Sequence, residues 1–118
     1  MVRHGVAPFL ECSSRGEKRL SAFYARPARY NGWSIEDIYQ ANKRFEDGST
    51  GLTWRQAKGR KAVNQTEVSV LYAQLWNEYV REHPELLQLI RAASGLSDMF
   101  GQDGRCCQAT ELWRIRNG

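Results

Sequence analysis

Residues 34–45 read SIEDIYQANKRF, and this stretch decides how the rest of the chain is interpreted. Ser34 can cap the start of a helix, and Asp37 follows three residues later, as in a capping box. No Gly or Pro interrupts the stretch, so the sequence predicts a helix that continues through Phe45. Wound at about 3.6 residues per turn, this helix has an apolar face that consists of Ile35, Ile38, Ala41 and Phe45.

The opposite face of the predicted helix carries Glu36, Gln40 and Lys43, with Tyr39 at its edge. A carboxylate, an amide and an amine in one row can bind a polar substrate such as a sugar. The same pattern also fits an ordinary amphipathic helix with a solvated side. The rest of the sequence must decide between these two interpretations.

Length and composition predict one domain over residues 1–118. The hydrophobic content of 42% is enough for a real core in a chain of this size. The formal net charge of +4 is compatible with a phosphate-bearing ligand or a nucleic acid. It is equally compatible with an ordinary soluble protein, because the positive charges are scattered along the chain.

The cysteines indicate the cellular environment. The sequence has three, Cys12, Cys106 and Cys107. Their odd number and the adjacent pair argue against a disulfide framework, and adjacent cysteines lack the spacing of a structural zinc site. No apolar run approaches the roughly 18 residues of a membrane span, and the first residues do not form a signal peptide. We therefore expect a cytoplasmic protein with reduced thiols and no contact with a membrane.

Periodicity and turn signals predict an α+β fold that is predominantly helical, with about five helices and a small β-hairpin or sheet near the N-terminus. Residues 1–8 are expected to form a loose arm, residues 9–12 a short strand, and residues 28–33 a small hairpin or a strand–turn around Asn31-Gly32. Thr53 and Gln56 predict a second capping box and a short helix.

Residues 66–82 give the strongest helical pattern, and the apolar stripe of this predicted helix is Val68, Leu71, Tyr72, Leu75, Trp76 and Tyr79. His83-Pro84 ends this helix and starts another. A last short helix, or alternatively a strand, is expected within residues 106–116.

Two polar loops are candidates for ligand binding. Residues 13–19, SSRGEKR, combine hydroxyls, a glycine and cations, which suit phosphate binding but also fit a solvated turn. Residues 96–105, LSDMFGQDGR, carry Asp98, Gln102 and Asp103 beside glycines that allow a close backbone approach to a ligand. A plain surface connection is the alternative for this second loop.

The spacing of several motifs resembles the NADAR family of NAD- and ADP-ribose-associated proteins, which is similar to the bacterial riboflavin-pathway N-glycosidase. The family's "sxExxYQAxK" element corresponds to residues 34–43, with Glu36, Tyr39-Gln40-Ala41 and Lys43 in register. Its strand and polar loop, "lSNF" element, glycine turn, "GR" element and long helix correspond to residues 9–13, 20–23, 30–33, 59–60 and 76–89. The sequence departs from the family at Ala22, where the Asn is missing, at Ile38, and in the shorter stretch after Gly95.

The resemblance implies an N-glycosidase that cleaves the bond between C1 of a ribose and a nitrogen. The substrate classes it implies are phosphoribosylamino-pyrimidine intermediates of riboflavin synthesis and ADP-ribosyl groups on guanine in nucleic acids. It implies no metal and no cofactor. Two other functions fit the sequence: a module that binds ADP-ribose or a nucleotide without turning it over, and a small basic protein that binds nucleic acid.

The resemblance also suggests roles for individual residues. Glu36 would stabilise positive charge at C1 or activate water, and Lys43 would bind the sugar or attack C1. Asp98 or Asp103 would protonate the leaving nitrogen. The residues expected to bind the base, sugar or phosphate are Arg15, Lys18, Ser21, Phe23, Tyr39, Gln40 and Arg60.

Overall fold

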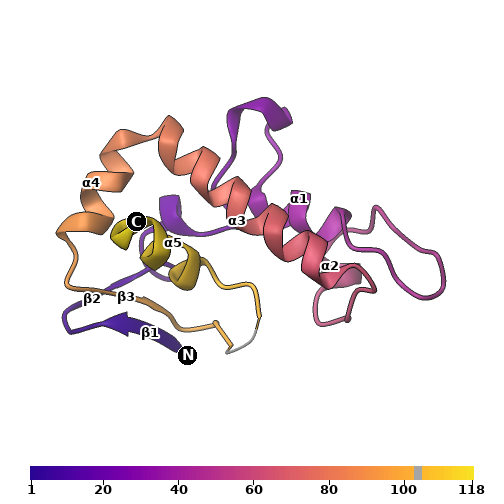
Figure 1. Cartoon of the computed structure of the whole chain (residues 1–118), viewed down its shortest axis with the longest axis horizontal. Helices are drawn as coiled ribbons and strands as arrows, with labels where there is room; N and C mark the ends of the chain where they lie inside the picture. Colours follow the sequence, from indigo (N-terminus) through magenta and orange to yellow (C-terminus); the bar gives the residue numbers. More distant parts are fainter. Residues whose placement is uncertain (103–104) are drawn as a thin grey trace.

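Helices form the larger part of the regular secondary structure, and a three-stranded sheet lies at one end of the molecule (Figure 1). The computed structural model describes residues 1–102 and 105–118. Within these residues the strands are β1 (Val2–Gly5), β2 (Phe9–Glu11) and β3 (Gly95–Asp98), and the helices are α1 (Ile35–Ala41), α2 (Trp54–Ala57), α3 (Gln65–Glu82), α4 (Pro84–Ala92) and α5 (Gln108–Asn117). The predicted class, α+β and mostly helical with about five helices, is confirmed.

The sheet has the order β1-β3-β2, so its middle strand comes from late in the chain. β3 pairs antiparallel with β1, which brings Val2 opposite Asp98, and parallel with β2, which brings Phe9 opposite Gly95. A Cβ atom at Gly95 would lie 2.6 Å from the carbonyl oxygen of Val6 and 2.8 Å from that of His4. Only glycine therefore fits at this position of β3, where it pairs with both β1 and β2.

Three local predictions in this region are wrong. The expected loose arm over residues 1–8 contains β1, and the expected loop over residues 96–105 begins inside β3. β3 reads GLSD, which has one large apolar side chain and no β-branched residue, so nothing local marks it as a strand. The expected hairpin or strand–turn over residues 28–33 contains no strand: it is a 3-10 turn, Ala28–Tyr30, followed by a left-handed Asn31.

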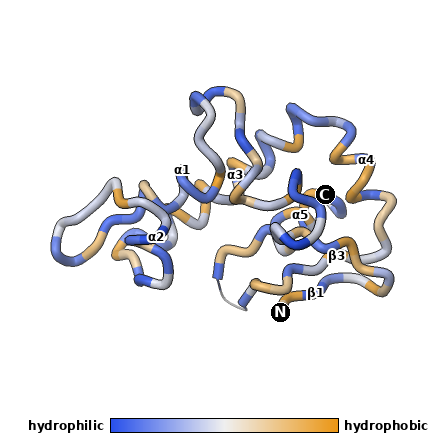
Figure 2. Tube along the Cα trace, turned by 180° about the vertical axis from the view of Figure 1, so that it is seen from behind, coloured by the Kyte–Doolittle hydropathy of each residue, from blue (hydrophilic) through white to orange (hydrophobic). Residues whose placement is uncertain are grey.

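Helix α3 organises the main core, as the periodicity predicts. Its buried residues are Val68, Tyr72, Leu75, Trp76, Tyr79 and Val80. They pack in one hydrophobic cluster with side chains from β1, β3, α1, α4 and α5. Helix α4 starts at Pro84 as predicted, and hydrophobic residues recur along it in Figure 2. Helix α5 confirms the helical alternative for the last segment, and it lies between the sheet and α3 in Figure 1.

Helix α1 begins where the sequence predicts but ends earlier. The hydroxyl oxygen of Ser34 accepts a hydrogen bond of 3.1 Å from the backbone N–H of Asp37, which confirms the N-cap. The predicted continuation through Phe45 is wrong, because α1 ends at Ala41. The side-chain amide of Asn42 donates to the carbonyl of Ile38 at 2.7 Å, a local contact that competes with further helix formation.

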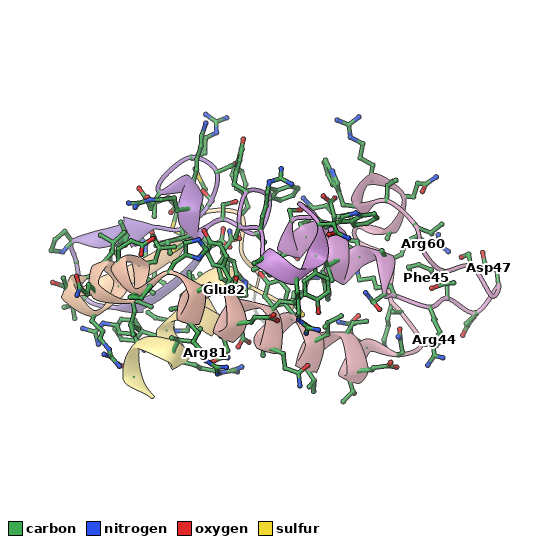
Figure 3. All side chains as sticks on the ribbon, turned by 90° about the horizontal axis from the view of Figure 1, so that it is seen from above. Arg44, Phe45, Asp47, Arg60, Arg81 and Glu82 are labelled. Atoms are coloured by element: carbon green, nitrogen blue, oxygen red, sulfur yellow. The ribbon has the colours of Figure 1, made fainter. Side chains whose placement is uncertain are left out.

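Phe45 instead belongs to a small second core, with Ala57, Ala62 and the half-buried Leu52. This core supports the segment that contains α2, whose capping box at Thr53 and Gln56 is confirmed. Figure 3 shows Arg44, Asp47 and Arg60 gathered around Phe45 at this end of the molecule. Among the described residues, no helix combines the length and the apolar character that crossing a membrane requires.

Candidate active site

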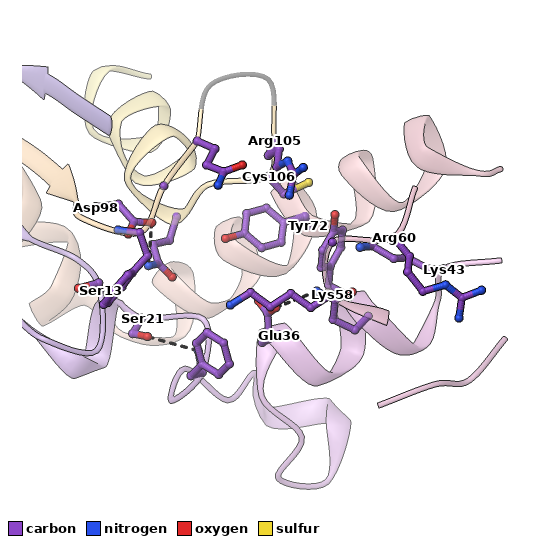
Figure 4. A pocket seen from close by; sticks show the side chains of 18 of the residues that line it. Ser13, Ser21, Glu36, Lys43, Lys58, Arg60, Tyr72, Asp98, Arg105 and Cys106 are labelled. Carbon is purple, nitrogen blue, oxygen red and sulfur yellow. Dashed lines mark hydrogen bonds between the residues drawn. The ribbon is translucent and has the colours of Figure 1, made fainter. Parts of the chain in front are cut away.

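A cavity of about 600 Å³ opens beside α1 and receives side chains from segments that are far apart in the sequence (Figure 4). The segments that line it are the loop after β2, residues 21–23, α1 with Lys43, residues 58–61, α3, residues 98–102, residues 105–106 and the start of α5. A cavity of this volume lies within the ~300–1,000 Å³ range that is usual for ligand sites.

The cavity lies at the carboxyl ends of the two parallel strands. Ser13 follows β2 and Asp98 ends β3, and both line the cavity. Loops at the carboxyl ends of parallel strands commonly hold ligands. Here the carboxylate of Glu11 joins the two loops, because it accepts hydrogen bonds from the backbone N–H of Ser13 at 3.0 Å and of Met99 at 3.1 Å.

The predicted row on α1 does face the cavity, although it is less solvated than an amphipathic helix would make it. Glu36, Tyr39, Gln40 and Lys43 all line the cavity. Gln40 is 3% exposed and Lys43 is 5% exposed. The side-chain N–H of Gln40 donates to Oε1 of Glu36 at 2.9 Å, and the ammonium of Lys43 lies 5.0 Å from the centre of the Tyr39 ring.

Burial changes the acid–base properties of this row. Loss of solvent raises the pKa of the Glu36 carboxyl, against the opposing effects of the Gln40 hydrogen bond and of the positive charges of Lys58 and Lys43. Loss of solvent also lowers the pKa of the Lys43 ammonium, although the charge of Glu36 opposes this. Both groups are thus shifted toward their neutral forms, which is characteristic of functional sites.

Residues 21–23 are held against the start of α1 by backbone hydrogen bonds. The N–H of Glu36 donates to the carbonyl of Ala22 at 2.9 Å, and the N–H of Ala22 donates to the side chain of Gln108 at 2.8 Å. The first N–H groups of a helix need partners outside the helix, and Ala22 supplies one of them. This arrangement brings Ser21 and Phe23, two of the residues expected to bind the substrate, to the cavity that Glu36 also lines.

Asp98 lines the cavity but is engaged on both oxygens. Its Oδ1 accepts from the backbone N–H of Phe100 at 3.0 Å, and its Oδ2 accepts from the side chain of Gln108 at 2.9 Å. With 4% of its surface exposed, this carboxylate acts in the structure as a hydrogen-bond acceptor. Asp103, the other predicted acid, lies outside the described residues.

The predicted phosphate-binding cations are only partly brought together. Arg60 lines the cavity, where its guanidinium also packs 4.0 Å from the centre of the Phe45 ring and pairs with Asp47 at 3.6 Å. Arg15 and Lys18 are exposed and are not among the residues that line the cavity. The ammonium of Lys18 instead lies 5.3 Å from the centre of the Tyr24 ring.

Some cavity residues lie outside the motifs and loops that the sequence marks for ligand binding: Lys58, Lys61, Gln65, Tyr72, Cys106 and Gln108. Ser13, Ser14, Phe100 and Arg105, by contrast, belong to the two candidate loops. The "GR" element, Gly59-Arg60, has a lysine on each side in the sequence. This group of cations was the available signal that residues 58–61 contribute to a binding site. Tyr72 was assigned to the core stripe, and it is both buried and in contact with the cavity. Nothing in the sequence marks Cys106 or Gln108, which reach the cavity only through the packing of the chain's last segment.

Among residues 1–102 and 105–118, no three His, Cys, Asp or Glu side chains are placed to share a metal ion. The cysteines are free thiols, with Cys12 and Cys107 buried and Cys106 half-buried. No protein-family model matches the chain, and no curated protein matches it at a significant level. The resemblance to the NADAR family therefore rests on the motifs in the sequence alone.

Proposed function

We propose that this chain is an N-glycosidase that hydrolyses the bond between C1 of a ribosyl or ADP-ribosyl group and a nitrogen. Its substrates would be of the phosphoribosylamino-pyrimidine or ADP-ribosyl-guanine type. The observation that carries the proposal is that Glu36 and Lys43 both line a cavity of about 600 Å³. Such a volume suits a nucleotide-sized ligand, and the surrounding cations favour an anionic one. The motif resemblance of residues 34–43 supports the choice of bond.

The chemistry needs a group that stabilises positive charge at C1. When the C1–N bond breaks, its electron pair leaves with the nitrogen, which takes up a proton, and C1 becomes electron-poor. The ionised carboxylate of Glu36 stabilises that charge and accepts a proton from the water that attacks C1. Glu36 suits this role because its side chain is partly shielded from bulk water and held by Gln40.

Lys43 acts in one of two ways, according to its protonation. As an ammonium group, it binds hydroxyl or phosphate oxygens of the substrate. As a neutral amine, it attacks C1 of a substrate whose ribose ring has opened to an imine with the base nitrogen. The C1–N bond to the base then breaks, the base leaves as an amine that takes the proton from Lys43, and water later hydrolyses the imine that remains between C1 and Lys43. The lowered pKa of Lys43 increases the share of the neutral amine at a given pH.

The hydrogen bonds of Asp98, the candidate second acid, favour an alternative function. Both oxygens of Asp98 are engaged by Phe100 and Gln108, which makes Asp98 a poor donor of a proton to a leaving nitrogen. A module that binds ADP-ribose or a nucleotide without turning it over needs no such donor. The two functions share the same cavity and differ only in whether product forms.

Turnover assays on the purified protein test the proposal, with a phosphoribosylamino-uracil compound and ADP-ribosyl-guanosine as substrates. Replacing Glu36 with Gln should lower the rate by at least about 100-fold, the usual effect of removing one group that stabilises the transition state. Glu46→Gln makes the same change on an exposed carboxylate and should keep the rate. Full turnover by Glu36→Gln would reject the role of Glu36, whereas calorimetric binding without product would favour the binding module.

A further inference from the structure

Residues 58–61 place three cations on one short segment at the cavity. Lys58, Gly59, Arg60 and Lys61 all line it, and the three charged side chains belong to exposed residues. Arg60 pairs with Asp47, but among the described residues no carboxylate lies within ion-pair distance of Lys58 or Lys61. The ammonium of Lys58 lies 5.5 Å from the centres of the Phe23 and Trp54 rings. Mutual repulsion between these cations is relieved by an anion.

The segment is anchored on both sides by the second core. Ala57 immediately precedes residues 58–61 and Ala62 immediately follows them, and both alanines are buried against Phe45. Gly59 lies between the cations with a φ of +80°, a left-handed conformation in which glycine is unstrained. A Cβ at this position would meet no atom within 4 Å, so the backbone conformation rather than crowding calls for glycine here.

The wall formed by residues 13, 14 and 21 carries neutral hydroxyl groups. Ser13, Ser14 and Ser21 line this part of the cavity, whereas Arg105 adds another cation to its lining. Hydroxyls and cations together are the groups that bind phosphate oxygens in proteins. Figure 4 shows Lys58 and Arg60 on one side of the cavity and Ser13 and Ser21 on another.

We propose that the cations of residues 58–61, rather than Arg15 and Lys18 of the loop over residues 13–19, bind the phosphate or diphosphate group of the ligand. The identity of the whole ligand rests on the proposed function, whereas the assignment of an anion site to residues 58–61 does not. Arg15 and Lys18 do not line the cavity, so they are not placed to share this anion.

Limited digestion with trypsin tests the site directly, because trypsin cleaves after Lys and Arg. Inorganic pyrophosphate is the probe, inorganic phosphate is the weaker comparison, and sulfate at equal ionic strength controls for salt. At about ten times its dissociation constant, pyrophosphate should slow cleavage after Lys58, Arg60 and Lys61 about tenfold, because only the free protein is cut. Cleavage after Arg15 and Lys18 in the same digest should not change.

A paired set of variants provides the second measurement. Lys58→Gln with Lys61→Gln should weaken pyrophosphate binding about tenfold or more, since two charge-assisted contacts are lost, and should reduce its dependence on salt. Arg15→Gln with Lys18→Gln removes the same charge and should leave binding unchanged.

Equal protection at all tryptic sites, or weaker binding in the Arg15/Lys18 pair alone, would overturn the assignment, as would the absence of pyrophosphate binding. Failure of the N-glycosidase proposal is a separate result. It would appear as pyrophosphate binding at residues 58–61 without turnover of any ribosyl compound.

Discussion

The side-chain amide of Gln40 donates a hydrogen bond of 2.9 Å to Oε1 of Glu36, one helical turn earlier on α1. An ionised carboxylate can only accept, so this contact presents the nitrogen of Gln40 to Glu36 and leaves the carbonyl oxygen of Gln40 buried without a partner among the described residues. Such an arrangement stabilises the charged form of Glu36 at a cost to Gln40. Buried polar groups that are incompletely satisfied are found at sites where function limits stability.

Glu36→Gln should therefore stabilise the protein at neutral and higher pH. Burial raises the pKa of the Glu36 carboxyl, so the folded state holds this proton more tightly than the unfolded chain does. Wild-type stability then falls as pH rises through the window between the ordinary Glu pKa, about 4.3, and the raised value. We expect a gain of about 1 kcal/mol for Glu36→Gln at about pH 8 that disappears near about pH 4.

Urea unfolding of both proteins at the two pH values measures this difference. Glu46→Gln, on an exposed carboxylate, should change stability little at either pH. A wild-type protein that is more stable than Glu36→Gln at high pH would show that burial of this carboxylate does not lower the stability of the fold.

Lys43 should titrate at a lower pH than an ordinary lysine. Its ammonium is shielded from solvent and rests against the Tyr39 ring, and burial lowers its pKa. After reductive methylation with isotope-labelled formaldehyde, the methyl resonance of Lys43 should reach its midpoint below about pH 10.4, the usual lysine value. Lys43→Arg identifies the resonance, because it removes only the Lys43 methyl signal. A midpoint at or above the usual value would remove the case for a nucleophilic amine.

The elements that could be predicted from the sequence are those specified by local signals. Ser34 and Thr53 are N-caps, Pro84 starts α4, and the apolar stripe of α3 is continuous over its length. These signals depend on residues that are close in sequence, so they can be recognised without knowing how distant segments pack. The row on α1 was predictable for the same reason, because the helix period alone puts Glu36 and Gln40 on one face.

Features that depend on distant segments were missed. β3 is a strand because it lies between β1 and β2, some ninety residues away, and its own sequence carries no strand signal. The sequence left open whether the polar face of α1 is a ligand site or a solvated side. It is a cavity wall, because residues 58–61, 98–102 and 105–106 line the same cavity. Arg15 and Lys18 have the composition of a phosphate site but lie on an exposed turn, since composition does not specify where a loop folds.

Asp98→Asn should destabilise the fold, because both carboxylate oxygens accept hydrogen bonds. Asparagine offers one acceptor oxygen, so its nitrogen would face either Phe100 N–H or the side chain of Gln108. Gln108 cannot turn its amide without losing the bond from the backbone N–H of Ala22. We expect a loss of about 1–3 kcal/mol in urea unfolding, the cost of a buried donor without a partner.

Asp37→Asn is the matched control for Asp98→Asn. Asp37 accepts from the hydroxyl of Ser34, which can rotate to donate or accept. Its replacement should cost less than about 1 kcal/mol. Unchanged stability of Asp98→Asn together with lost turnover would assign Asp98 to the chemistry instead of to the scaffold.

Glu11 should be the residue on which the two loops at the strand ends depend most. Its Oε2 accepts from the N–H groups of Ser13 and Met99, and its Oε1 accepts from the hydroxyl of Ser97 at 2.8 Å. Burial alone would raise the pKa of this carboxyl, but the hydrogen bonds from Ser13, Met99 and Ser97 outweigh it and lower the pKa. The stability that Glu11 contributes is therefore present above the ordinary Glu pKa and is lost as pH falls through the lowered value.

Two substitutions separate the hydrogen bonds of Glu11 from its charge. Glu11→Gln keeps an acceptor for the two N–H groups and can donate to Ser97, so it should cost less than about 1 kcal/mol and remove the pH dependence. Glu11→Ala leaves the donors of both loops unpaired and should cost at least about 2 kcal/mol and weaken ligand binding in the cavity. Urea unfolding and pyrophosphate titration measure both effects. Equal losses for the two variants would mean that the negative charge of Glu11, rather than its hydrogen bonds, holds the loops around the cavity.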